Sequence, residues 1–276
     1  MVFRGVGRVT AAVVVIGVVG LVSGCAAAAP AAHRSPTPNA TSSAAPASIQ
    51  QQLPNLLVAG QTIGTGELRV VDHEPIANPV ADRPVTGAVR IVVGADRDIE
   101  VHIRPDDPAT TDLTGLDLMM TGQRRDGKPE NIQDAAFFGL LPTGSGTDAS
   151  GELVLTLGLA APYAGDPTFL HSLQESPSGD ARVLAATAIT WSLPSAYPGL
   201  TVADGGVQTY AHGRTVVDGG TLAYYVPNPY DTIYQVSRRF GLTETQLVWL
   251  NPELFMYSDE PQLTSGIGVN LDPARR

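Results

Sequence analysis

The stretch from Leu222 to Leu271 limits the possible fold of this chain more than any other feature of its sequence. An aromatic run typical of a strand opens the stretch, two short helical patterns follow, and an apolar strand pattern closes it. In both helical patterns, apolar residues recur at a spacing that would bury them along one face. They are Ile233, Val236, Phe240, Leu247 and Leu250. The stretch is therefore predicted to fold as a β-α-α-β unit.

Boundary signals at both helical patterns support this interpretation. Asp231 is expected to be the N-cap of the first helix, because its carboxylate can accept hydrogen bonds from the unpaired amides of the first turn. Gly241 stands where that helix should end, since glycine tolerates the left-handed backbone conformation. Thr243 and Gln246 have the spacing of a capping box at the start of the second helix. That helix is expected to end just before Pro252.

The order and spacing of these segments resemble the LysM domain, a family of small modules that bind the N-acetylated glycan of peptidoglycan or chitin. The matching blocks are Tyr224-x-Val226, Asp231-Thr232-Ile233, Phe240-Gly241-Leu242-Thr243, Leu247-x-x-Leu250-Asn251 and Leu263-x-x-Gly266-x-x-Val269-x-Leu271. The chain differs from the family pattern at Tyr230, where glycine is usual, and in the longer segment from Pro252 to Gln262.

The resemblance implies a glycan site between the loop before the first helix and the loop after the second. The glycan-binding residues that it implies are Tyr230, Asp231, Thr232, Ile233, Asn251, Pro252 and Leu254. Asp231, Thr232 and Asn251 would supply polar groups, and the apolar residues would contact N-acetyl methyl groups. The alternative is a LysM-like unit that only packs within the protein or contacts another protein.

The first residues of the chain have the layout of a secretory signal. Arg4 and Arg8 give it a positive start, and the apolar run Ala11–Val22 follows. This run is shorter than the ~20 residues that a membrane-spanning helix needs. We therefore expect export from the cytoplasm rather than a membrane span.

A cysteine follows the apolar run, and the motif Val22-Ser23-Gly24-Cys25 resembles a bacterial lipobox. The resemblance implies that residues 1–24 are a lipoprotein signal peptide and that Cys25 is diacylated. Because two acyl chains hold a protein stably on a bilayer, we expect a lipid anchor in the cell membrane, facing the cell wall. The alternative is an ordinary signal peptide with a chance cysteine. Residues 25–55, rich in Ala, Pro, Ser and Thr, are predicted to be a disordered spacer after this anchor.

From residue 56 to residue 215 the chain changes to short strand patterns. Ile99, Val101 and Ile103, for example, alternate with polar residues, so one face of that strand is expected to be buried. Turn clusters rich in Gly, Pro and Asp separate the strands, and one short helical turn is expected at 131–137. These patterns predict an antiparallel β-sandwich or barrel-like domain, so the protein should be mainly β.

The LysM-like domain is predicted to span residues 216–276. The segment that leads into it, Pro194–Gly220, is rich in glycine. The segments Val207–Tyr210 and Thr215–Val217 are expected to form a small hairpin there. The composition favours a short, turn-rich connector over a second long linker.

Composition and motifs argue against several classes of function. The net charge of -10 is unsuited to nucleic-acid binding, which needs a concentrated basic surface. A single cysteine leaves no internal disulfide and no cysteine-rich metal cluster. The β region has no G-x-S-x-G motif and no histidines at metal-ligand spacing. Asp106, Asp107, Asp112 and Asp117 match no known calcium loop, so a solvated acidic turn is expected. We therefore predict no metal, no cofactor and no catalysis.

Together these features predict a lipid-anchored extracytoplasmic protein that binds peptidoglycan or a related GlcNAc-containing glycan. Its function would be attachment to, or organisation at, the cell wall. Two alternatives remain open. The β domain could be a cell-wall glycan hydrolase, since the separation of paired carboxylates exists only in three dimensions. It could instead bind another envelope protein, with the LysM-like domain only localising it.

Overall fold

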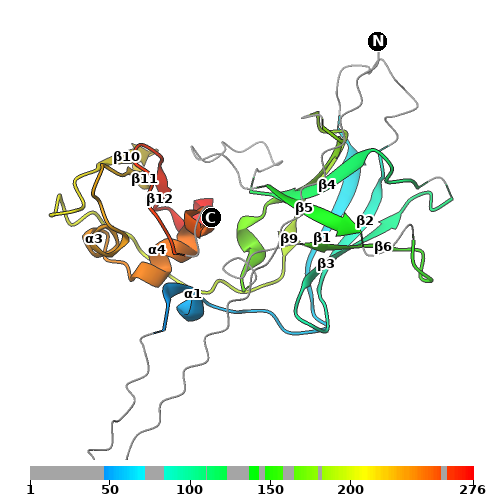
Figure 1. The fold of residues 1–276 in the computed structure, drawn as a ribbon, viewed down its shortest axis with the longest axis horizontal. Helices are drawn as coiled ribbons and strands as arrows, with labels where there is room; N and C mark the ends of the chain where they lie inside the picture. The colour runs from blue at the N-terminus through cyan, green and yellow to red at the C-terminus, as the bar shows by residue number, and fades with distance from the viewer. Residues whose placement is uncertain are drawn as a thin grey trace, which may run out of the picture. The chain divides into compact units, whose positions relative to one another are not determined.

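The computed structural model of the protein describes most residues after position 46 (Figure 1). The described ranges are 47–71, 84–109, 111–122, 137–142, 147–157, 165–179, 182–255 and 260–276. The predicted signal peptide, Cys25 and most of the predicted spacer lie outside these ranges. The end of the spacer, residues 47–55, lies inside them and includes a helical turn at Ile49–Gln52, so the prediction of disorder is wrong for this part. The predicted helical turn at 131–137 also lies outside them, apart from Phe137, which begins a strand. Within the described ranges, no helix has both the length and the hydrophobicity needed to cross a membrane.

The first large part of the described chain is an antiparallel sheet with the strand order β2-β3-β6-β5-β4-β7-β8-β1-β9 (Figure 1). Strand β1 also pairs with β2, at the other end of this order. Strands β1 to β8 therefore close into a barrel, and β9 adds to it beside β1. Its strands are β1 (Thr62–Val70), β2 (Gly87–Val93), β3 (Ile99–Pro105), β4 (Leu116–Thr121), β5 (Phe137–Pro142), β6 (Leu153–Leu157), β7 (Ser172–Pro177), β8 (Ala185–Ala188) and β9 (Thr190–Trp191). The predicted antiparallel, barrel-like domain in a mainly β protein is confirmed.

Alternating side chains of the strands form the core of the barrel. In the register of β2 and β3, Val89 lies opposite Ile103 and Ile91 lies opposite Val101. All four residues are buried. Since successive side chains of a strand point to opposite faces, a shift of one residue would move this whole set out of the core. The predicted alternation around Val101 therefore fixes the strand register.

The barrel is preceded by the helical turn α1 (Ile49–Gln52) and contains the short 3-10 helix η1 (Pro167–Phe169). The chain then continues into a smaller unit, called here the C-terminal unit, which spans the described residues from 196 onward. Its sheet has the antiparallel order β10-β11-β12. Its elements are β10 (Arg214–Asp218), β11 (Thr221–Val226), α3 (Ile233–Arg239), α4 (Glu244–Leu250), η2 (Pro252–Phe255), β12 (Val269–Asn270) and η3 (Pro273–Arg275).

The ends of the two helices in the C-terminal unit follow local sequence signals, with one correction. Gly241 has a φ of +70° after α3, and Thr243 and Gln246 form a capping box at α4, as predicted. The N-cap of α3 is Thr232, however, and not Asp231. The hydroxyl of Thr232 accepts the backbone N–H three residues further on, at 3.2 Å. Asp231 is unavailable as a cap because its carboxylate is bound by other groups.

The predicted hairpin between Val207–Tyr210 and Thr215–Val217 is wrong. Strand β10 pairs instead with β11, which follows it directly. Gly219 and Gly220 connect the two strands and both have positive φ, at 57° and 85°. Two such residues make the tight turn that favours a hairpin between neighbouring strands. The glycine pair Gly219-Gly220 is therefore a hairpin turn inside the C-terminal unit.

Residues before β10 also belong to the C-terminal unit. Tyr197, Leu200 and Val202 pack against its hydrophobic core. The backbone N–H of Gly205 donates to the carbonyl of Arg239 at 2.8 Å. The boundary predicted between residues 215 and 216 falls inside β10.

Candidate functional site

An open groove of about 490 Å³ lies on the C-terminal unit where α3 begins. The turn before α3, the start of α4 and the segment at 260–263 form its walls, together with one residue of α1. The lining residues are Ile49, Asp231, Thr232, Ile233, Tyr234, Glu244, Glu260, Pro261, Gln262 and Leu263. This volume is within the usual range of a small-molecule site.

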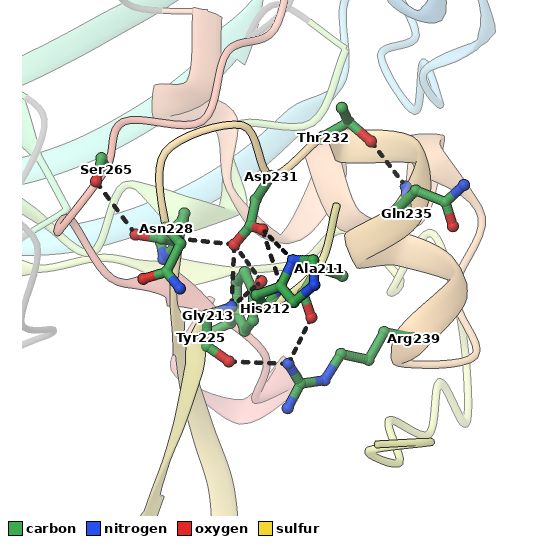
Figure 2. Close-up of polar contacts among 11 residues, drawn as sticks. Ala211, His212, Gly213, Tyr225, Asn228, Asp231, Thr232, Gln235, Arg239 and Ser265 are labelled. Carbon is green, nitrogen blue, oxygen red and sulfur yellow. Dashed lines mark hydrogen bonds and ion pairs between the residues drawn. The ribbon is translucent and has the colours of Figure 1, made fainter. Parts of the chain in front are cut away.

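Asp231 organises the turn that leads into α3 (Figure 2). Its side chain is only 1% exposed. Its carboxylate accepts hydrogen bonds from the hydroxyl of Tyr225 (2.5 Å) and from the backbone N–H groups of His212 (2.9 Å), Gly213 (3.1 Å) and Asn228 (2.8 Å). Burial favours the neutral acid, but these donors outweigh it and hold the pKa of Asp231 below its ordinary value. The carboxylate therefore fixes the shape of the turn.

Arg239 fixes the segment before β10 from the other side. Its guanidinium pairs with the carboxylate of Asp204 at 2.7 and 2.8 Å. Its Nη1 also donates to the carbonyls of Ala211 (2.9 Å) and Gly213 (2.8 Å), as Figure 2 shows in part. The bond with Asp204 raises the pKa of Arg239 and lowers the pKa of Asp204. Because Gly213 is bound by both Arg239 and Asp231, the turn before α3 has a rigid support.

The first turn of α3 supplies exposed surface to the groove. Thr232 is exposed, and its backbone N–H donates to the carbonyl of Tyr210 at 2.9 Å. Ile233 is partly buried and packs against the hydrophobic cores. The Tyr234 side chain is 49% exposed, and its hydroxyl accepts a 3.0 Å hydrogen bond from Arg238. This turn therefore presents a hydroxyl, an aliphatic edge and an aromatic ring beside one another.

Asn251 joins the end of α4 to β12. Its side-chain nitrogen donates to the carbonyls of Leu247 (2.8 Å) and Asn270 (2.9 Å). Its side-chain oxygen accepts the backbone N–H of Asn270 at 2.5 Å. Asn251 is buried, as are its neighbours Pro252 and Leu254, and none of the three lines the groove. These residues support the wall of the groove from inside.

The predicted glycan-binding residues thus fall into two groups. Asp231, Thr232 and Ile233 line the groove, whereas Asn251 and its two neighbours are buried behind the surface. Tyr230 precedes the first group and is 86% exposed. Its φ is +74°, in the left-handed region that glycine adopts more easily.

Sequence reasoning missed several lining residues. It singled out neither Tyr234 nor Glu244, and it placed Glu260–Gln262 in the long segment after the second helix and Leu263 in a LysM-like block, without assigning any of them to the site. The segment from Pro252 to Gln262 is longer than in the LysM family pattern, and this extra length was the sequence signal for the wall formed by residues 260–263. Ile49 gave no sequence signal, because it lies far from the LysM-like stretch along the chain.

A second polar cluster lies on the barrel, around His102 of β3. Its Nε2 lies 2.9 Å from Glu100 and its Nδ1 lies 3.1 Å from Glu152. Arg90 donates to Glu152 at 2.7 Å. Burial works to raise the pKa of Glu152, but the bonds to Arg90 and His102 hold it below its ordinary value. The two carboxylates are thus partners in one polar network around His102.

Two of the four acidic residues considered for calcium, Asp107 and Asp112, accept hydrogen bonds within their own turns. Asp107 accepts the backbone N–H of Ala109 at 3.2 Å, and Asp112 accepts that of Thr114 at 2.8 Å. In the part of the chain that the structure describes, no group of three or more His, Cys, Asp or Glu side chains could hold a metal ion.

Comparisons of the chain with protein-family models, with curated proteins and with solved structures returned no match. Because a fold such as a β barrel hosts many functions, the function has to be argued from the groove and its chemistry.

Proposed function

We propose that this protein is a lipid-anchored extracytoplasmic protein whose C-terminal unit binds the N-acetylated glycan of peptidoglycan without cleaving it. The observation that carries the proposal is the groove at the start of α3. It is bounded by the loop before the first helix and by the loop after the second, which are the two loops that the LysM resemblance assigns to glycan contact.

The lining of the groove suits an N-acetylated sugar. Such a sugar carries hydroxyl and amide groups that need hydrogen-bond partners, and methyl groups that need apolar contact. Thr232, Glu244 and Gln262 offer hydroxyl, carboxylate and amide groups, while Ile233 and Leu263 offer aliphatic surface. Sites with this mixture orient a ligand by a few polar contacts within an apolar lining.

The supports of the groove favour a preorganised site. Asp231 and Arg239 hold the turn before α3, and Asn251 holds the end of α4 to the sheet. A rigid site spends less free energy on ordering its own side chains when a ligand binds. The groove is nevertheless open and shallow, so we expect millimolar to micromolar affinity, which corresponds to about 4–8 kcal/mol.

The anchoring part of the proposal depends on Cys25. A diacylated Cys25 would hold one end of the protein on the membrane, and the C-terminal unit would bind the wall at the other. The barrel would then be carried between the two, where it could meet another envelope protein. The role that follows is non-catalytic attachment or organisation at the cell wall.

Incubation of the complete chain, purified in detergent, with insoluble peptidoglycan tests this function. We expect protein to bind the insoluble fraction and no soluble sugar fragments to appear. Absence of binding at any salt concentration would contradict the glycan-binding proposal. Release of fragments that Glu152→Gln abolishes would replace it with a hydrolase whose site lies on the barrel.

A further inference from the structure

The helical turn α1 lies beside the groove, although the whole barrel separates it from the C-terminal unit along the chain. α1 has its own start signal, a capping box between Ser48 and Gln51. Gln51 donates its backbone N–H to the Ser48 hydroxyl at 3.3 Å, and Ser48 donates its backbone N–H to the Gln51 side chain at 3.1 Å. The turn is therefore specified by local sequence.

Contacts on the C-terminal side of α1 hold it in place. Leu53 packs against both the barrel core and the core of the C-terminal unit. The backbone N–H of Leu56 donates to the carbonyl of Gly165 at 2.8 Å. A Cβ on Gly165 would lie 2.3 Å from the carbonyl oxygen of Pro54, so the two segments pack closely there. α1 itself packs against α4.

This placement brings Ile49 into the lining of the groove. The groove then has three aliphatic residues, Ile49, Ile233 and Leu263, which come from α1, α3 and the segment before β12. Each of the three is partly buried and packs against the hydrophobic cores. Exposed aliphatic edges of this kind are suited to contact with a ligand methyl group.

We propose that Ile49 of α1 is a specificity-determining residue of the groove, which contacts the methyl of an N-acetyl group together with Ile233 and Leu263. This inference rests on the proposed glycan binding. It adds a contact that the C-terminal unit alone cannot supply. The glycan site is therefore built from two distant parts of the chain.

Titration of the complete chain with the tetramer of N-acetylglucosamine tests the inference, with Ile49→Ala as the variant. We expect binding about 3- to 10-fold weaker, because the substitution removes apolar contact area. Ile49→Leu should restore most of the affinity. Gln50→Ala is the matched control, because Gln50 lies on the same turn and does not line the groove. Thermal unfolding of each variant shows whether the fold is retained.

Saturation-transfer NMR on the same samples separates direct contact from a structural role. In the unsubstituted protein the acetyl methyl protons should receive strong saturation relative to the sugar-ring protons. Ile49→Ala should lower that ratio, whereas a merely structural effect would weaken all ligand signals equally. Unchanged or tighter binding by Ile49→Ala would overturn the inference and leave the proposed function intact. A failure of the unsubstituted protein to bind the tetramer or peptidoglycan would overturn the proposed function itself.

Discussion

The indole Nε1 of Trp249 donates a 2.7 Å hydrogen bond to Oδ2 of Asp166, which joins α4 of the C-terminal unit to the residue preceding η1 in the barrel. Both side chains are buried. The guanidinium of Arg276 also pairs with Asp166, at 3.3 Å, and lies 4.2 Å from the Trp249 ring centroid. Burial lowers the pKa of Arg276 to about 10. A buried polar network of this kind couples the stability of the parts it joins.

The first prediction follows from this network. The barrel and the C-terminal unit should unfold in one cooperative transition. Trp249→Phe should lower the free energy of unfolding by about 1–2 kcal/mol, because Asp166 loses a buried donor. Urea unfolding followed by far-UV circular dichroism measures both effects. Tyr234→Phe, at an exposed ring, should change little. Two separate transitions in the unsubstituted protein would contradict the coupling.

Asp231→Asn should destabilise the C-terminal unit by roughly 2–3 kcal/mol, because an amide cannot accept all the hydrogen bonds that the carboxylate accepts. The folded pKa of Asp231 lies below its unfolded value, so its contribution is present above the ordinary carboxyl pKa and is lost as pH falls through the folded pKa. The difference between the two proteins should therefore shrink in acid. Unfolding measured at pH 7 and at about pH 3 checks this; an equal difference at both values would argue against the role.

Much of this fold could be predicted because local signals determine it. The alternation at Val101 and its neighbours predicted strand β3, and the capping box at Thr243 and the left-handed Gly241 predicted helix ends. The N-cap prediction failed at Asp231 because Asp231 and Thr232 are adjacent and both are good caps. Contacts from His212 and Gly213 decide between them, and these contacts do not depend on local spacing.

The candidate site could be predicted only in part. The resemblance placed Thr232 and Ile233 in the groove, since the loop before α3 is local in sequence. It also assigned ligand contact to Asn251, whose side chain is used to join α4 to β12. The contribution of Ile49, like the bond between Trp249 and Asp166, depends on tertiary packing over a long sequence separation. Sequence patterns carry no information on such contacts.

Glu175 should make the stability of the barrel depend on pH. It is fully buried, and burial raises its pKa to about 7, although its carboxylate accepts the backbone N–H of Val85 at 3.0 and 3.2 Å. Because the folded pKa exceeds the unfolded one, its contribution is complete below about pH 4.5 and is lost as pH rises toward 7 and above. The loss should be on the order of 3 kcal/mol at most.

Glu175→Gln is expected to flatten this pH dependence and to make the protein more stable than the unsubstituted chain at pH 8. Burial raises the pKa of Glu253 to about 7 as well, so some pH dependence should remain in the variant. Urea unfolding at pH 5 and pH 8 measures the change. If the free energy of unfolding changed equally between pH 5 and pH 8 in the two proteins, a buried, titrating Glu175 would be contradicted.

Lipid attachment is predicted to depend on Cys25, the cysteine of the motif that resembles a lipobox. Cys25→Ala should block acylation, so the protein should leave the tightly membrane-bound fraction or accumulate as an uncleaved precursor. Mass spectrometry of the native protein and fractionation of the variant check this. Unchanged processing of the variant, with no acyl mass on the native protein, would show that the anchor does not exist.

Glycan binding in the groove is the central claim, and Thr232 is the residue at which it is tested most directly. Thr232→Arg should crowd the groove, but it also removes the N-cap hydroxyl of α3, at a cost of about 1 kcal/mol. Thr232→Ala loses the same cap without crowding and is therefore the matched control. Thr190→Arg adds the same charge at an exposed position on the barrel.

The measurement is the fraction of complete chain that sediments with insoluble peptidoglycan, for the unsubstituted protein and these three variants. We predict that the unsubstituted protein and Thr190→Arg bind equally. Thr232→Ala should keep only part of the binding, because it loses the hydroxyl contact without crowding the groove, and Thr232→Arg should fall to background while remaining folded. Equal binding by Thr232→Arg and the unsubstituted protein would contradict the claim that the groove at the start of α3 holds the glycan.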